Sequence, residues 1–110
     1  MVKLNDTTVS CMLERILEPY IYTAEEYIED NGSVTLFSVD LDLVENGKDK
    51  EEAINKLAAG ILDFSEDFYN DFDLWARGSR MAQIPYVLKA LMLNDIEKIG
   101  SLIICRPGES

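Results

Sequence analysis

The longest regular pattern of apolar positions lies in the middle of the chain and has the spacing of a helix. It begins after Asp49, whose carboxylate can accept the backbone amide of Glu52 while Glu52 reaches back, as in a capping box. Gly60 interrupts the pattern at a cost of about 1 kcal/mol relative to alanine, which a close approach of helix and sheet would justify. We predict a helix that extends to about Asn70. Its apolar positions are Ala53, Ile54, Leu57, Ala58, Ile61, Leu62, Phe64, Phe68 and Phe72.

Before this helix, apolar and polar residues alternate with a period of two, which is typical of strands. The alternation covers residues 20–28 and resumes over residues 33–41, after an Asn31-Gly32 dipeptide that favours a hairpin turn. A third short strand is expected to begin near Asp40 and to include residues 41–44. A turn at residues 45–47 would close it.

The first segment of the chain has two interpretations. An apolar stripe predicts a short helix capped by Thr8, and a strand over residues 9–13 is the alternative. Pro19 ends either element, because proline disfavours helical backbone at the residue before it. Residues 1–7 are expected to form a loose terminus. The stripe consists of Cys11, Met12, Ile16 and Leu17.

A second helix is predicted after a break at residues 77–79. It is capped by Ser79 or by Gln83, and it tolerates Pro85 in its first turn, where a missing backbone N–H costs little. The buried stripe of this helix consists of Val87, Leu88, Leu91 and Met92.

The chain closes with one further helical turn and a strand. Residues 94–97 have the pattern of a second capping box, and Gly100 would end the turn that it opens. Residues 101–105 are an apolar run typical of a buried strand, and residues 106–108 end the fold. The order of elements predicts a single α+β domain over residues 1–110, with a small antiparallel sheet backed by one long helix and one or two short helices. We recognise no separate DNA-binding domain.

The charge of the chain narrows the classes of partner. There are 21 acidic and 10 basic residues and no histidine, which gives a net charge of −11. Such a chain is repelled by nucleic acid and by anionic membranes, and it attracts basic proteins. The charge is uneven, because residues 14–73 carry −13 and residues 77–106 carry +3. We therefore expect a basic protein partner and a homodimer in which opposite halves meet. No signal peptide or membrane span is recognised, so a cytoplasmic location is expected.

The residue types give no positive sign of an enzyme. Without histidine, no serine or cysteine has the usual base beside it, and Cys11 and Cys105 lie too far apart in sequence for a zinc-binding pair. Asp40 and Asp42 alternate along a strand and could hold a divalent cation with a third acid, although exposed carboxylates at a sheet edge are the ordinary explanation. We expect no catalytic residue, metal or cofactor.

The densest acidic stretch is residues 63–73, which contain five acidic residues and no base, with aromatic residues interleaved. One interpretation is a solvated helix face over a buried aromatic stripe. The other is a recognition edge, in which aromatic anchors and carboxylates bind a basic partner. Residues 71–75 follow the predicted helix end and are expected on a loop. We predict these partner-binding residues: Tyr69, Asp71, Phe72, Asp73 and Trp75.

Residues 20–62 resemble the HicB-like antitoxin domain of bacterial toxin–antitoxin systems. In that family a strand with alternating acids leads through a glycine turn to a second strand that ends in Asp-Leu. A short segment that ends in glycine and a capped helix that begins Glu-Glu-Ala then follow. The matching residues here are the hairpin at 27–36, the segment 40–47 and the helix start at 49–54. The match covers about two fifths of the chain.

The whole chain, including residues 84–89 and 102–105, also looks like small bacterial proteins grouped with prevent-host-death or HicB-type antitoxins. The resemblance implies a β-β-β-α-β domain, dimerisation and neutralisation of a basic ribonuclease toxin. HicB antitoxins usually carry a helix-turn-helix or ribbon-helix-helix for operator DNA, which is not recognised here. The resemblance therefore implies toxin neutralisation without direct nucleic-acid contact. The alternative function is a stand-alone structural or regulatory homodimer.

Overall fold

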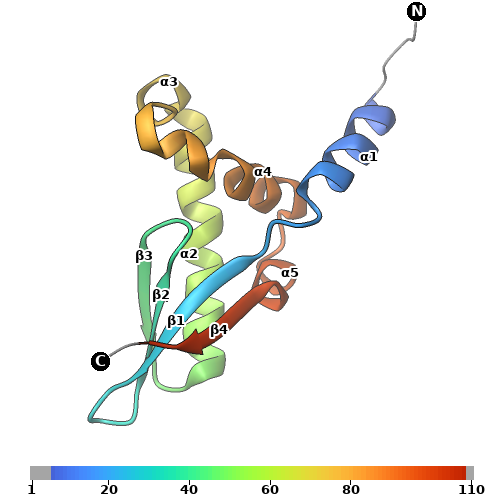
Figure 1. Cartoon of the computed structure of the whole chain (residues 1–110). Coiled ribbons are helices and arrows are strands. Elements are labelled where there is room, and N and C mark those ends of the chain that lie inside the picture. Colours follow the sequence, from blue (N-terminus) through green and yellow to red (C-terminus); the bar gives the residue numbers. More distant parts are fainter. Residues whose placement is uncertain (1–5, 109–110) are drawn as a thin grey trace, which may run out of the picture.

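The fold is a four-stranded sheet with helices packed on one face (Figure 1). The structure is a computed structural model that describes residues 6–108. The long helix α2 crosses behind the sheet, and α1 points away from both (Figure 1). The elements are α1 (Asp6–Leu17), β1 (Tyr22–Ile28), β2 (Val34–Ser38), β3 (Leu43–Gly47), α2 (Lys50–Asn70), α3 (Phe72–Trp75), the 3₁₀ helix η1 (Gly78–Gln83), α4 (Ile84–Leu93), α5 (Ile96–Ser101) and β4 (Ile103–Pro107).

The predicted α+β class is confirmed, but the sheet is mixed and not wholly antiparallel. The strand order is β3-β2-β1-β4, and β4 runs parallel to β1. The reason is the helical crossover from α2 to α5. It returns the chain to the end of the sheet where β1 begins, and the amide of Tyr22 there donates to the carbonyl of Leu102 over 3.2 Å. A strand that enters at that end runs in the same direction as β1.

The core lies between the sheet and α2. Alternate side chains of β1 and β2 point into it, as the period-two pattern predicts. Gly47 lets the start of α2 approach β3 closely, because a Cβ there would lie 2.4 Å from the backbone nitrogen of Ala53. The close approach of helix and sheet suggested for Gly60 is not required, since a Cβ there would lie 3.3 Å from a carboxylate oxygen at the movable end of the Glu45 side chain and near no backbone atom of the sheet. The buried residues of α2 are Ala53, Leu57, Ala58, Ile61, Ser65 and Phe68.

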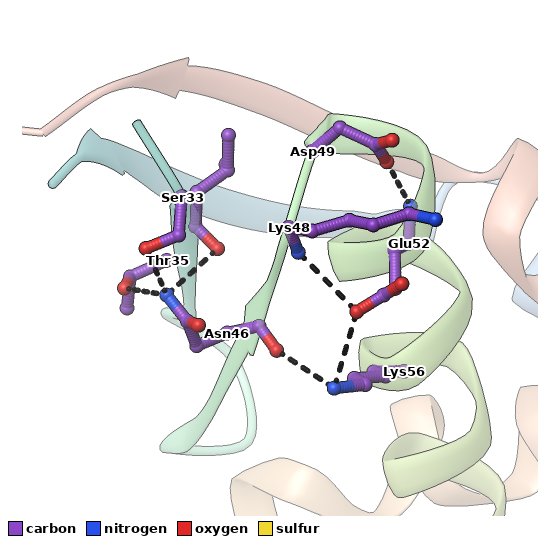
Figure 2. A network of polar contacts seen from close by, with 8 residues as sticks. Ser33, Thr35, Asn46, Lys48, Asp49, Glu52 and Lys56 are labelled. Carbon is purple, nitrogen blue, oxygen red and sulfur yellow. Dashed lines mark hydrogen bonds and ion pairs between the residues drawn. The ribbon is translucent and has the colours of Figure 1, made fainter. Parts of the chain in front are cut away.

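The start of α2 is tied to β3 by a polar network (Figure 2). The Asp49 carboxylate accepts the amide of Glu52 over 2.8 Å, so the predicted N-cap is confirmed. Glu52 reaches back to the amide of Lys48 over 3.2 Å, and Lys56 joins Glu52 to the carbonyl of Asn46. The Asn46 side chain donates to the carbonyl of Val34, to the hydroxyl of Thr35 in β2 and to that of Ser33 just before β2. The network fixes the direction in which α2 leaves the sheet.

One turn prediction was wrong at the sheet. Residues 45–47 belong to β3 and do not form a turn. The turn lies instead between β2 and β3, where Asp42 has a φ of +59° and its amide donates to the carbonyl of Ser38. Aspartate tolerates this left-handed backbone, so the chain reverses four residues earlier than expected. Arg106 and Pro107 also belong to β4, because proline is tolerated on an edge strand.

The remaining differences concern the helices. The first element is the helix α1, so the alternative prediction of a strand over residues 9–13 was wrong. Because α1 begins at Asp6, Thr8 lies inside the helix and is not its N-cap. Of the loose terminus expected over residues 1–7, residues 1–5 lie outside the described residues. Gln83 occupies the N-cap position of α4, but its side chain makes no capping bond. The second predicted capping box was one residue off: the cap of α5 is Asp95, which accepts the amide of Lys98 over 3.1 Å, whereas Asn94 ends α4 in a left-handed conformation.

Candidate partner-binding surface

The predicted partner-binding residues lie at the C-terminal end of α2 and on α3. We call residues 63–75 the acidic–aromatic end. Here α2 ends at Asn70, and the carbonyl of Asp71 accepts the amides of Leu74 and Trp75, which closes the single turn of α3. The expectation that residues 71–75 form a loop was therefore wrong. The short helix folds back beside the last turns of α2 (Figure 1).

Four aromatic side chains fasten α3 to α2. Phe68 is buried, and the half-buried ring of Trp75 lies 6.0 Å from the Phe64 ring and 6.4 Å from the Phe68 ring. Phe72 also contacts Phe68, with ring centroids 6.3 Å apart. Edge-to-face pairs of this kind stabilise the contact beyond the area that they bury. The underside of the acidic–aromatic end is therefore part of the packed body of the protein.

The outer side of the same end leaves large apolar side chains in solvent. Tyr69 and Leu74 are each 69% exposed, and Phe72 is 49% exposed. With Asp71 and Asp73 they line one shallow depression. Leu74 was not predicted from the sequence, since a lone leucine carries no charge or aromatic signal. The stretch therefore has a packed aromatic side and an exposed apolar side, and the recognition edge stays a prediction for the exposed side.

The carboxylates of this depression have no basic side chain bound to them. Asp71 and Asp73 are exposed, and neither is among the ion pairs of residues 6–108, which join Lys50 to Glu26 and Lys56 to Glu52. The nearby arginine Arg77 donates to the backbone carbonyl of Asp73 over 2.7 Å and leaves the carboxylate free. Such carboxylates are available to a cation from outside the chain.

A neighbouring groove separates the acidic–aromatic end from the turn after β2. The guanidinium of Arg80 lies 4.4 Å from the centre of the Trp75 ring, which is a cation–π contact. The side-chain oxygen of Gln83 is buried there and has no hydrogen-bond partner among residues 6–108. Sequence reasoning missed this contact because Arg80 follows the base-free stretch. The groove is lined by Leu41, Asp42, Leu43, Phe64, Trp75, Ser79, Arg80 and Gln83.

The two aspartates considered for a cation have structural roles. The Asp40 carboxylate accepts the amide of Thr23 over 2.7 Å, and Asp42 lies in the left-handed turn. Within residues 6–108 no three side chains of the metal-binding types converge on one point.

Burial raises the pKa of Tyr22 above its ordinary value, and its hydroxyl donates to the carbonyl of Tyr86 over 2.7 Å. The same range contains no helix with the length and apolarity to cross a membrane.

Comparison with known proteins gives the family. Residues 7–105 match the model of the PHD-like family, which is described as "Antitoxin of toxin-antitoxin, RelE / RelB, TA system". The chain belongs to this antitoxin family. The match covers nearly every described residue, including α1 and β4, and an antitoxin of this kind implies a toxin as partner.

A solved antitoxin has the same fold. It is described as the antitoxin part of a proposed toxin/antitoxin system from Syntrophomonas wolfei subsp. wolfei, and it superposes with a TM-score of 0.83 at 28% sequence identity. The alignment covers 90% of this chain and 72% of that protein. No curated protein sequence matches the chain. The family and this structure point to a regulatory protein without catalytic activity.

Proposed function

We propose that this antitoxin masks a basic toxin by direct contact at the acidic–aromatic end. The observation that carries the proposal is the exposure of Tyr69, Phe72 and Leu74 beside the unpaired carboxylates of Asp71 and Asp73. Exposed aromatic anchors supply binding energy at the centre of an interface, and carboxylates around them pair with lysine or arginine. Trp75 contributes from below, because its ring holds α3 in place.

A toxin that acts on RNA fits this surface. A protein that binds RNA needs a basic surface for the phosphates, and the carboxylates of the antitoxin would neutralise that surface. The net charge of −11 supports the same partner, since it favours approach of a basic protein. It also opposes contact of this chain with operator DNA, so we propose action by protein contact, in the cytoplasm and without membrane binding.

The hairpin and helix start also support a place among HicB-like or prevent-host-death antitoxins. The chain turns at Gly32 with a φ of +86°, and α2 begins with the capped Glu51-Glu52-Ala53 segment. We further propose that the chain is a homodimer. This part is supported by apolar side chains of α1 that remain exposed in a single copy.

The toxin-binding proposal is tested by titration calorimetry with the toxin encoded beside the antitoxin gene. Replacing Tyr69 and Phe72 by alanine should raise the Kd by about 100-fold, because two central anchors are removed. The matched control is Ile28→Ala, since Ile28 is 67% exposed but lies at the end of β1. The proposal is wrong if the double variant binds as tightly as the control.

A further inference from the structure

The groove between the acidic–aromatic end and the turn after β2 gathers polar groups that the rest of the chain leaves unpaired. Its volume of about 370 Å³ gives room for one long side chain of a partner. Leu41, Leu43 and Phe64 supply apolar walls. The Trp75 ring supplies an aromatic face, and we call the site the Trp75 groove. Apolar walls with a few placed polar groups are the usual make-up of a binding site.

The cation that lies in this groove is held by the indole ring alone. The guanidinium of Arg80 lies 4.4 Å from the centre of the Trp75 ring, and within residues 6–108 its side chain forms no ion pair and no hydrogen bond. The neighbouring Arg77, by contrast, is hydrogen-bonded to a backbone carbonyl. Arg80 is exposed on the short helix η1, and a cation–π contact at an exposed site is weak. The face of Trp75 is therefore a cation site whose present occupant leaves at little cost.

Two acceptors in the same groove lack a donor. The Asp42 carboxylate is exposed and belongs to no ion pair of the described residues. The buried side-chain oxygen of Gln83 has no partner there either, and the same side chain makes no capping bond to α4. An unpaired buried acceptor costs stability, so its presence beside a groove calls for a donor from outside the chain.

We propose that the Trp75 groove binds an arginine side chain of the basic toxin, which displaces Arg80 from the indole ring. The incoming guanidinium stacks on Trp75 and pairs with the Asp42 carboxylate. It also donates to the oxygen of Gln83, once rotation of that amide turns the oxygen into the groove. Arginine fits these groups better than lysine, because its guanidinium is planar and carries five donors in fixed directions. The proposal deepens the toxin binding proposed above and rests on it.

The charges around the groove favour a cation from the partner over an anion. An anionic side chain would pair with Arg80, but it would meet the Asp42 carboxylate in the groove. It would also meet Asp71 and Asp73 in the depression formed by the residues just before Trp75. A cation is attracted by all three carboxylates, and its repulsion by Arg80 ends when Arg80 moves out into solvent.

The first test is titration calorimetry of full-chain variants with the toxin encoded beside the antitoxin gene. Gln83→Met keeps the length of the side chain and removes the unpaired oxygen. It should raise the Kd about tenfold without lowering the free energy of unfolding, whereas loss of a purely structural residue lowers that free energy. The matched control is Asn55→Met, which removes an exposed amide of α2 outside the groove and should bind as wild type does.

The second test has the opposite sign. Arg80→Ala should lower the Kd for the toxin about threefold, because the toxin arginine no longer displaces a competing cation. Trp75 is the only tryptophan of the chain, so its emission reports on the groove without the toxin. A tetra-arginine peptide should shift this emission at a lower concentration than tetra-lysine does, and at a still lower one in Arg80→Ala. Equal responses to the two peptides, or a weaker response in Arg80→Ala, overturn the displacement.

The outcomes separate this inference from the proposed function. If Tyr69→Ala with Phe72→Ala weakens toxin binding but Gln83→Met does not, the groove is not a contact and the acidic–aromatic end stands. If only Gln83→Met weakens it, the groove is the contact and the acidic–aromatic end is not. If neither does, both assignments are wrong.

Discussion

The acidic–aromatic end and the apolar face of α1 (Val9, Met12 and Ile16) both expose large apolar side chains, but they differ in charge and in support. Phe72 stands on buried Phe68, with Asp71 and Asp73 beside it. Val9, Met12 and Ile16 stand on α1, which points away from the sheet (Figure 1). Arg15 follows Met12 by three residues on the same helix. Apolar exposure shows that a surface is available for contact, and the charges around it favour one class of partner over another.

The largest effect is expected from the support beneath the acidic–aromatic end. Phe68→Ala should lower the free energy of unfolding by about 3–5 kcal/mol, because it opens a cavity under Trp75 and Phe72. The neighbouring Tyr69→Ala should change it by less than about 0.5 kcal/mol, since Tyr69 is exposed. Urea unfolding measures both. Equal losses would mean that the end has no separate buried and exposed sides.

The second largest effect is expected on the rate of association with the toxin, and it distinguishes the local charge of the acidic–aromatic end from the net charge of the chain. Asp71→Asn with Asp73→Asn should slow association with the toxin about tenfold at low salt, and less at high salt. The control Glu14→Gln with Glu18→Gln removes the same charge from α1 and from the residue that follows it. Stopped-flow mixing measures both rates. If the two pairs slow association equally, net charge alone attracts the toxin and the comparison fails.

A smaller effect is expected from the arginine over the indole ring. Arg80→Ala should cost about 0.5–1 kcal/mol of stability and expose one face of Trp75. The chain has one tryptophan, so a red shift of its emission reports on this end alone. Met12→Glu should leave the emission unchanged. A shift of the emission in Met12→Glu would show that α1 and the acidic–aromatic end are coupled.

The smallest effect concerns pH and the start of α2. The bond from the amide of Lys48 to the Glu52 carboxylate lowers the pKa of Glu52 in the folded state. The ionised cap therefore stabilises the fold above the pKa of the unfolded chain, and this stabilisation is lost as the pH falls through the folded pKa. Glu52→Gln should be less stable than wild type at neutral pH and equal to it in acid. Urea titrations at both pH values test this; a constant difference contradicts it.

Local signals predicted the parts of the fold that depend on neighbours in sequence. The cap at Asp49 and the apolar repeat after it gave the extent of α2, because both act within a few residues. The parallel pairing of β4 was not predictable, since it depends on where a long helical crossover returns the chain. Asp42 and Asn46-Gly47 both permit a turn, and the packing of Gly47 against Ala53 decided between them.

The candidate surfaces were predicted in part. Composition singled out Tyr69 and Phe72, and the structure shows both exposed. It could not show that Trp75 packs on Phe64 under Arg80, because three residues from different turns meet only in the folded chain. The apolar stripe predicted on α1 consisted of Cys11, Met12, Ile16 and Leu17, but only Leu17 of these is buried. The exposed apolar side chains of α1 include Val9, because the packing of the body decides which side of the helix is covered.

The parallel strand β4 also has a consequence for the timing of folding. Tyr22 pairs with Ile103, about eighty residues later, so one edge of β1 has no strand to pair with until residues 103–107 leave the ribosome. Contacts this distant in sequence form slowly, because a long loop must close first. By then β1, β2, β3 and the whole of α2 have been synthesised. The acidic–aromatic end can therefore be in place before the sheet receives its fourth strand.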